Sequence, residues 1–228
     1  MTNARSGDMI STDSQSINMG QSTTMARITK NAEERKQELI NAAERLFLEK
    51  GYERTAVSDI VRLVHVAQGT FYYHFDSKSD ILEAVLEKNF VELESTLGSI
   101  GARSDIDPCE KFNQMINCVF RFTKGKRQLV DNAHLDSNTI LHHRLEEMSH
   151  TKLIPHIAEV VKEGVTREQF DAPYPTETAN VLFHAVVHLM HEHGLLSENA
   201  RRKRVRVALE HLLVRALGVE DDRITLKL

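Results

Sequence analysis

Apolar residues along this chain recur at intervals of three and four positions, whereas strict alternation of apolar and polar residues is scarce. The first spacing is that of a helix with one buried face, and the second is that of a half-buried strand. The N-terminal third predicts three helices and the start of a longer one, over residues 31–50, 55–64, 68–75 and from 76 onward. Gly51 lies where a left-handed residue would close the first helix, and Thr55 is the expected N-cap of the second.

Two segments interrupt this pattern in the rest of the chain and are expected to be loops, at residues 98–108 and 170–175. Around them the apolar spacing predicts further helices, over residues 109–122, 126–135, 137–163, 176–193 and 197–217. Pro155 lies inside one of these helices, where we expect a bend because proline has no backbone N–H to donate. The sequence therefore predicts an all-α fold of about nine helices.

The first 26 residues are rich in Ser, Thr, Asn, Gln and Gly and contain no apolar run, so we expect a disordered tail rather than a secretory leader. Cys109 and Cys118 are nine positions apart with no CxxC pair, which favours neither a disulfide framework nor a zinc site. No stretch approaches the roughly 18 consecutive apolar residues that a membrane-spanning helix needs. We expect a cytoplasmic protein with no contact to the membrane.

The formal net charge is −4, which at first sight disfavours a nucleic-acid partner. The charges are unevenly distributed, however, and residues 27–78 carry nine basic and eight acidic side chains. This segment is nearly neutral, so charge neither indicates nor excludes a polyanionic partner, and local chemistry has to decide.

The two short helices predicted between residues 55 and 75 have the arrangement of a helix-turn-helix, in which the second helix enters the DNA major groove. Phe71 and Phe75, four positions apart, would anchor that second helix inward. Gly69 would allow close approach to a phosphate or a base edge. Hydroxyl and ring N–H groups can bind phosphates without formal charge, and Lys78 adds one charge beside the first amides of the next helix.

Three stretches of this region resemble the tetracycline-repressor (TetR/AcrR) family: AAERLFLEKGYERT (42–55), RTAVSDIV (54–61) and AQGTFYYHFDSKSDIL (67–82). The resemblance covers about residues 30–90 and implies operator DNA as partner, a divergent C-terminal effector domain and a homodimer formed through the last two helices. Carried over by position, it implies DNA contacts from Val57, Ser58, Gln68, Gly69, Thr70, Tyr72, Tyr73, His74 and Lys78. Ala67 and Gln68 depart from the Ser and Lys that the family often has there, so the operator sequence does not transfer.

These boundaries divide the chain into a disordered tail, a helix-turn-helix DNA-binding domain, a ligand-sensing and dimerisation domain and a C-terminal tail, at residues 1–28, 29–78, 79–218 and 219–228. We expect a repressor that binds a palindromic operator as a dimer and is released by a small molecule. The two recognition helices would lie roughly 34–36 Å apart, one helical turn of DNA. A pocket for the effector is expected among the C-terminal helices, lined by Phe112, Met115, Phe120, His134, His142, Leu145 and Phe183.

Ten of the twelve histidines lie beyond residue 130, and His184, His188 and His191 share one helical stripe. Histidines four apart can chelate a transition metal, so a metal-responsive regulator stays open as an alternative. The stripe falls on the helix that the resemblance assigns to the dimer interface, and no carboxylate or thiol stands at ligand spacing. We therefore expect no bound metal or cofactor.

Two further alternatives stay open. One is an adaptor with the same fold but without DNA binding, which the weak charge and the residues Ala67 and Gln68 would fit. A hydrolytic metalloenzyme would have to use the histidine stripe, yet the chain has neither an HExxH pattern nor a positioned general base. We expect no enzyme.

Overall fold

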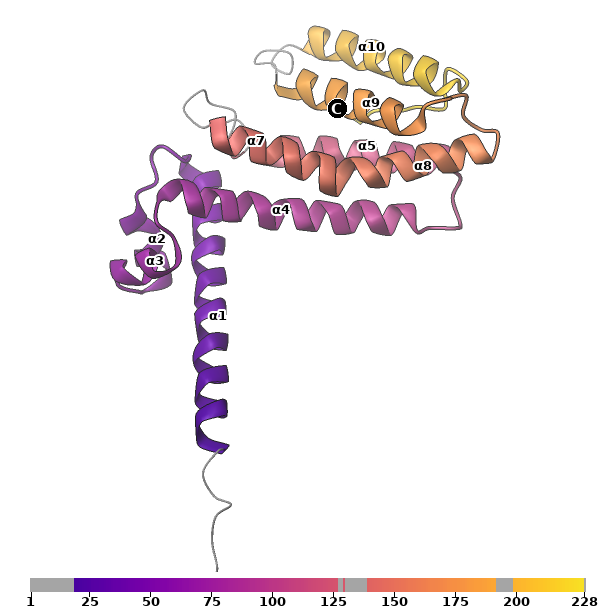
Figure 1. The fold of residues 1–228 in the computed structure, drawn as a ribbon. Helices are drawn as coiled ribbons and strands as arrows, with labels where there is room; N and C mark the ends of the chain where they lie inside the picture. The colour runs from indigo at the N-terminus through magenta and orange to yellow at the C-terminus, as the bar shows by residue number, and fades with distance from the viewer. Residues whose placement is uncertain (1–18, 127–128, 130–138, 192–198, 228) are drawn as a thin grey trace, which may run out of the picture.

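The computed structural model describes residues 19–126, 129, 139–191 and 199–227, and within these ranges every regular element is a helix. The predicted all-α class is confirmed. Figure 1 shows a long N-terminal helix, α1 (Met19–Lys50), standing across the end of a bundle of roughly parallel and antiparallel helices. Two short helices, α2 (Val57–Val64) and α3 (Gln68–His74), pack beside its C-terminal end.

Helix α1 begins at Met19 rather than at Asn31, so residues 19–28, which were predicted to belong to the disordered tail, are helical. The residues in between contain no proline and include good helix formers such as Met25, Ala26 and Arg27, although Gly20 and the Ser and Thr residues have lower helix propensity. The prediction was wrong here because these residues carry no apolar stripe that would mark a buried helical face. The rest of the predicted tail, residues 1–18, lies outside the described part of the chain.

A single apolar core joins α1, α2 and α3 to the first turns of α4 (Lys78–Gly101). Its members are spaced three or four residues apart on each helix, as predicted. They include Leu39, Ala43, Phe47, Ile60, Val61, Phe71, Phe75, Ile81, Leu82 and Val85. Ser77 caps α4, since its side chain accepts a hydrogen bond from the amide of Asp80 while the Asp80 carboxylate accepts from the amide of Ser77.

The predicted loop at 98–108 is shorter in the structure, because α4 continues to Gly101 and α5 spans Pro108–Gly125. Asp107 caps α5, and Pro108 occupies its first turn, where a missing N–H costs nothing. The helix predicted over 126–135 lies almost wholly outside the described residues.

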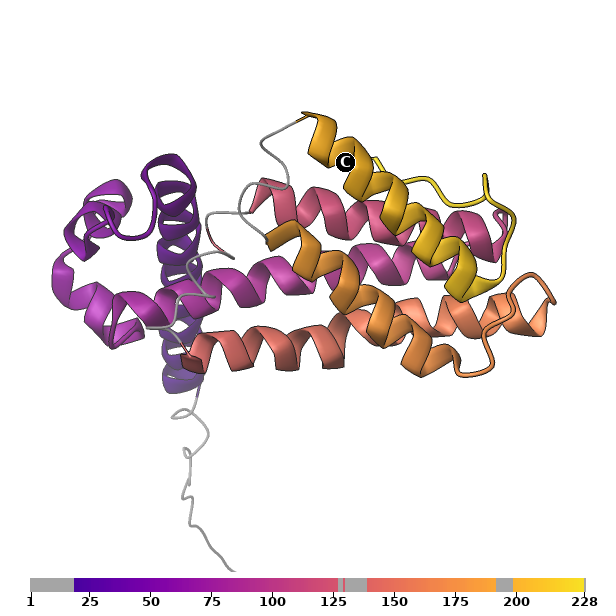
Figure 2. The ribbon, with the colours of Figure 1, turned by 90° about the horizontal axis from the view of Figure 1, so that it is seen from above.

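The helix predicted over 137–163 is divided in two, α7 (Thr139–Met148) and α8 (Ile154–Thr166), by one π-helical turn, η2 (Ser149–Leu153). The turn ends just before Pro155, whose ring and missing N–H disturb the preceding helical turn. Helices α9 (Pro175–His191) and α10 (Asn199–Leu217) follow and lie on the far side of α5 and α8 from α4 (Figures 1 and 2).

The C-terminal segment after α10 packs along α5 rather than extending freely. Ile224 and Leu226 are buried, at 3% and 1% exposure. The side-chain amides of Asn113 and Asn117 bind its backbone, with Asn117 donating to the carbonyl of Thr225 at 2.9 Å. No described helix combines the length and the hydropathy that crossing a bilayer would require.

Candidate nucleic-acid interface and effector cavity

Helix α3 separates its aromatic side chains between the core and the surface. Phe71 is fully buried and Phe75 nearly so, whereas Tyr72 and Tyr73 are 52% and 77% exposed. The two phenylalanines are four positions apart and share one helical face, so the residues between them must point outward. Two neighbouring exposed tyrosines offer a large contact area with polar ends, which makes this face of α3 a candidate binding surface.

The other residues predicted as DNA contacts lie around these tyrosines. Gln68 and Gly69 are exposed and Thr70 and His74 are half-buried on α3, while on α2 Ser58 is exposed and Val57 packs partly against the core. The ring of His74 meets that of Tyr73 edge to face, with centroids 4.8 Å apart. Burial lowers the pKa of His74, and repulsion from Lys36 acts in the same direction. Its imidazole is therefore neutral at neutral pH.

Gly69 has ordinary helical backbone angles, and a Cβ placed on it would meet nothing within 4 Å. The fold thus does not need a glycine here. Glycine inside a helix costs roughly 0.5–1 kcal/mol relative to alanine. Packing within the described chain therefore does not explain this glycine.

The turn between α2 and α3 is closed by His65, which adopts the left-handed conformation with φ 58°. Its amide donates to the carbonyl of Arg62, and the amide of Val66 donates to the carbonyl of Val61 at 3.0 Å. These bonds satisfy the last carbonyls of α2 and fix where the chain enters α3.

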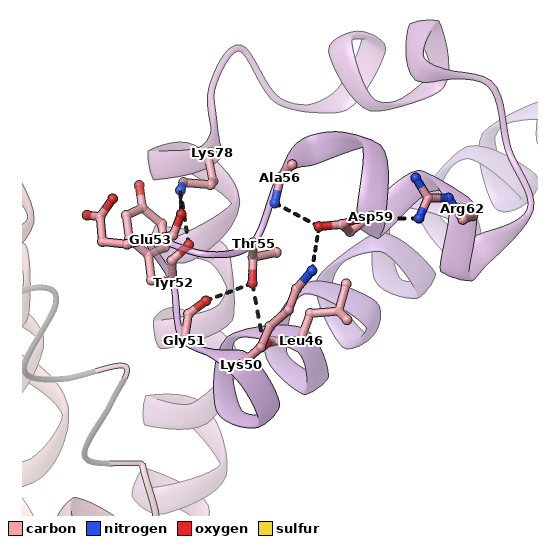
Figure 3. A network of polar contacts seen from close by, with 10 residues as sticks. All are labelled: Leu46, Lys50, Gly51, Tyr52, Glu53, Thr55, Ala56, Asp59, Arg62 and Lys78. Atoms are coloured by element: carbon pink, nitrogen blue, oxygen red, sulfur yellow. Dashed lines mark hydrogen bonds and ion pairs between the residues drawn. The ribbon is translucent and has the colours of Figure 1, made fainter.

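Figure 3 shows the polar network that holds the loop between α1 and α2. Thr55 is not the N-cap predicted from the sequence: it is buried, and its hydroxyl donates to the carbonyl of Gly51 at 2.8 Å. Ala56 is the N-cap and has no side-chain acceptor, but its amide donates to the Asp59 carboxylate at 3.1 Å, as the third helical residue of a capping box does. Gly51 adopts the left-handed conformation predicted for it, with φ 89°.

Asp59 also pairs with Lys50 at the end of α1 and lies 3.5 Å from Arg62. The hydrogen bond from Lys50, followed by that from the Ala56 amide, holds the pKa of this carboxyl below its usual value. The start of α2 is thereby tied to the end of α1.

Lys78, the first residue of α4, completes the network in Figure 3. Its ammonium donates to the carbonyls of Tyr52 at 3.0 Å and Glu53 at 3.4 Å and lies 4.2 Å from the centre of the Tyr52 ring. The predicted phosphate contact is thus engaged within the protein, where it links α4 to the loop that precedes α2.

A cavity of about 480 Å³ lies among α4, α5, α7, η2 and α9 in the C-terminal bundle. Eight apolar and six polar residues line it: Phe90, Leu93, Val119, Phe122, Leu145, Leu153, Phe183 and Val187, with Thr123, His142, Glu146, Ser149, His184 and His188. Cavities of this size bind drug-sized molecules in other proteins.

Three of the residues predicted for the effector pocket line this cavity, namely His142, Leu145 and Phe183. Phe112, Met115 and Phe120 do not: they are buried in the core on other faces of α5. His134 lies outside the described residues. The prediction missed the contribution of α4, although Phe90 and Leu93 belong to its apolar stripe.

Two of the three histidines considered for metal binding, His184 and His188, line the same cavity. The side chain of His191 is outside the described part of the structure. Among the side chains that are described, no three His, Cys, Asp or Glu residues are grouped so that they could hold a metal ion. Burial raises the pKa of the Cys109 thiol, which donates to the carbonyl of Arg223, so this thiol is protonated at neutral pH.

Residues 39–85 match the family described as bacterial regulatory proteins, tetR family. The chain is 30% identical over 123 residues to the HTH-type transcriptional regulator TtgR of Pseudomonas putida, a match that covers 54% of this chain and 56% of TtgR. The chain therefore spans only a little over half the length of that relative. It is also 46% identical over 48 residues to IcaR, the negative regulator of the biofilm operon icaADBC in Staphylococcus aureus, covering 21% of this chain and 26% of IcaR.

Solved structures with the same fold extend the likeness beyond this segment. A TetR/AcrR-family regulator from Thermobifida fusca superposes with a TM-score of 0.64 at 20% identity, covering 79% of this chain and 97% of that one. RolR in complex with resorcinol superposes with a TM-score of 0.61 at 20% identity, covering 85% and 92% of the two chains. The N-terminal segment is therefore similar to the tetR family of bacterial regulatory proteins, and the chain as a whole shares its fold with solved regulators of the TetR/AcrR family.

Proposed function

We propose that this chain is a ligand-responsive transcriptional regulator that binds double-stranded operator DNA as a homodimer. The observation that carries the proposal is the exposure of Tyr72 and Tyr73 on a short helix whose other face is fully buried. The proposed DNA contacts are Gln68, Gly69, Thr70, Tyr72, Tyr73 and His74 of α3, Val57 and Ser58 of α2, and Lys78. The matched family and TtgR, a transcriptional regulator, support the same function.

The chemistry of α3 suits a DNA groove. An α-helix with its side chains fits the major groove, and tyrosine hydroxyls and neutral imidazole N–H groups can donate to phosphates or base edges. The open space around Gly69 favours close approach of a phosphate or base to the backbone. Lys78 acts mainly as a positioning residue in the unbound protein, because its ammonium already binds two backbone carbonyls.

Dimerisation through α9 and α10 is part of the proposal. Both helices carry large apolar side chains that are exposed in the single chain, Val181 on α9 and Val207 and Leu212 on α10. A two-fold dimer would present two copies of α3 to successive major grooves, roughly 34–36 Å apart. This fits a palindromic operator and a location in the cytoplasm, where the DNA is.

The C-terminal cavity is the proposed effector site. Helix α4 supplies Phe90 and Leu93 to its wall, and the same helix begins at Lys78, which binds the loop before α2. A ligand that displaces α4 would therefore move the DNA-binding helices, and coupling of about 1–3 kcal/mol would change DNA affinity 5- to 150-fold. The solved complex of RolR with resorcinol and the negative regulation named for IcaR favour a repressor released by a small molecule.

Retardation of labelled DNA from upstream of the chain's own gene tests this proposal. The unmodified protein is expected to retard it at low salt. Tyr73→Ala should weaken binding by about 3–30-fold, the range for losing one or two hydrogen bonds with ring contact. Tyr174→Ala is the matched control, since Tyr174 is 69% exposed but precedes α9, far along the chain from α3.

The alternatives give different results in the same experiment. An adaptor without DNA binding would give no retarded band, or a band that Tyr73→Ala leaves unchanged. A metal-responsive regulator would release DNA on addition of Zn²⁺, Ni²⁺ or Cu²⁺, whereas the described residues offer no metal-binding group and favour an organic effector.

A further inference from the structure

The walls of the C-terminal cavity are aromatic on three sides. Phe90 of α4, Phe122 of α5 and Phe183 of α9 all line it, and the first two rings meet edge to face with centroids 5.7 Å apart. Aromatic side chains bind flat apolar molecules by stacking and edge-to-face contact. The volume of about 480 Å³ accommodates a ligand of two or three rings.

Among the described polar residues of the lining, His184 offers both a ring donor and a ring acceptor that bind no other described residue. Its ring lies against those of His150, at 5.2 Å between centroids, and Phe183, at 5.6 Å. No hydrogen bond joins either of its ring nitrogens to another described residue. The hydroxyl of Thr123, by contrast, donates to the carbonyl of Val119 at 3.0 Å.

The remaining polar groups of the lining already interact within the protein, and these include His142 and His188. The Ser149 hydroxyl donates to the carbonyl of Leu145 at 2.9 Å. The Glu146 carboxylate lies 3.4 Å from the His142 ring and 3.5 Å from that of His143. A polar group on a ligand therefore finds its best partner at His184.

The charges around the cavity select against anions. Among the described lining residues, Glu146 carries a negative charge, and none is a lysine or an arginine. Burial lowers the pKa of His184, and repulsion from His150 acts in the same direction, so its imidazole is neutral at neutral pH. A carboxylate entering this space would lose its hydration without gaining a counter-charge. A neutral imidazole, in contrast, can both donate to and accept from a hydroxyl.

We propose that this cavity takes an uncharged aromatic hydroxyl compound, with its rings against Phe90, Phe122 and Phe183 and its hydroxyl on a ring nitrogen of His184. The inference rests on the proposed effector role of the C-terminal bundle. It adds the chemical class of the ligand, the residue that forms a hydrogen bond with its polar group, and the exclusion of carboxylates of the same size.

Calorimetric titration of the full chain with four probes of equal size tests the inference: 4-phenylphenol, biphenyl, biphenyl-4-carboxylate and 4-(aminomethyl)biphenyl. At neutral pH, 4-phenylphenol is expected to bind at least about 10-fold more tightly than the carboxylate and about 3–10-fold more tightly than biphenyl. Equal or tighter binding of the carboxylate, tightest binding of the ammonium probe, or no binding of any probe would overturn it.

His184→Phe keeps the size of the ring and removes the hydrogen bond. It should weaken 4-phenylphenol about 5–30-fold and leave biphenyl within about 2-fold. His184→Gln, which keeps a donor and an acceptor, should retain more of the affinity than His184→Phe. His156→Phe is the matched control, because His156 lies half-buried on α8 outside the cavity. An unchanged affinity of His184→Phe for 4-phenylphenol overturns the proposed anchor.

DNA retardation measured on the same protein separates the two proposals. Retardation together with failure to prefer 4-phenylphenol rejects the ligand class and leaves the regulator intact. Selective binding of 4-phenylphenol without retardation rejects the regulator and leaves the ligand class intact.

Discussion

Replacing Glu44 by Gln is expected to weaken the joint between the DNA-binding helices and the C-terminal bundle. Glu44 lies on α1, and its side chain is 12% exposed. Its carboxylate accepts from Lys88 of α4 at 2.8 Å and from Lys126, which follows α5. One carboxylate therefore connects three helices, two of which belong to the bundle that contains the cavity.

The magnitude follows from the burial of the partners. A hydrogen bond to a charged group contributes about 1.5–3 kcal/mol when it is well shielded. The side chains of Lys88 and Lys126 are 28% and 27% exposed, so water screens part of each interaction. We expect Glu44→Gln to lower the free energy of unfolding by about 1–3 kcal/mol.

The effect should depend on pH in a defined direction. Burial by itself raises the pKa of Glu44, but the ammonium groups of Lys126 and Lys88 outweigh it, and the net result is a pKa below the ordinary 4.5. A carboxyl with a lowered pKa stabilises the fold above its unfolded value and loses that contribution as pH falls through its folded value. The difference between the original chain and Glu44→Gln should therefore be complete at pH 7 and shrink below pH 4.5.

Urea denaturation at pH 7 and again below pH 4.5 measures this difference in the free energy of unfolding. Glu49→Gln is the control, because Glu49 pairs with Arg45 on the exposed side of α1 at 55% and 64% exposure. Its loss should cost much less than that of Glu44, because water screens the exposed pair. Equal destabilisation by the two substitutions, or a difference that grows as the pH falls, would refute the argument.

Three further substitutions test the packing. In Gly164→Ala the new Cβ would lie 2.1 Å from the buried ring of Phe170, so thermal denaturation should show a loss of about 1–3 kcal/mol, and unchanged stability would contradict that packing. Phe71→Ala empties the core under α3 and should cost about 3–5 kcal/mol in the same assay, whereas a loss below 1 kcal/mol would mean that the ring is not buried. Asn117→Ala removes two bonds to the C-terminal segment, so trypsin should cleave after Arg223 faster than in the original chain, with mass spectrometry as the readout.

The helix-turn-helix was predictable from the sequence because its signals are local. The spacing of Phe71 and Phe75 fixes which face of α3 is buried, and a glycine after a helix indicates a left-handed residue, as Gly51 is. The exact start of α2 was missed because the Thr55 hydroxyl turns inward to the carbonyl of Gly51, and the N-cap is Ala56, whose side chain has no acceptor to signal it. Local preference favoured the hydroxyl, and tertiary packing decided otherwise.

The cavity could be predicted only in part because a periodic pattern does not distinguish a packed face from an open one. Phe112, Met115 and Phe120 belong to the apolar side of α5, as do Val119 and Phe122, and only the last two reach the cavity. Whether a residue of α5 reaches the cavity depends on the positions of α4, α7 and α9. Contacts between residues distant in sequence set these positions. The packed C-terminal segment was missed for a similar reason, since Asn117 binds it across 108 positions of chain.

The central claim is that α3 lies in the major groove, and dimethyl sulfate footprinting on the retarded DNA tests it most directly. The reagent methylates guanine at N7 in the major groove and adenine at N3 in the minor groove. We predict protection of guanine N7 in two patches about 10 base pairs apart, as two copies of α3 in a two-fold dimer require. Protection confined to adenine N3, or a single patch without a symmetric partner, would contradict it.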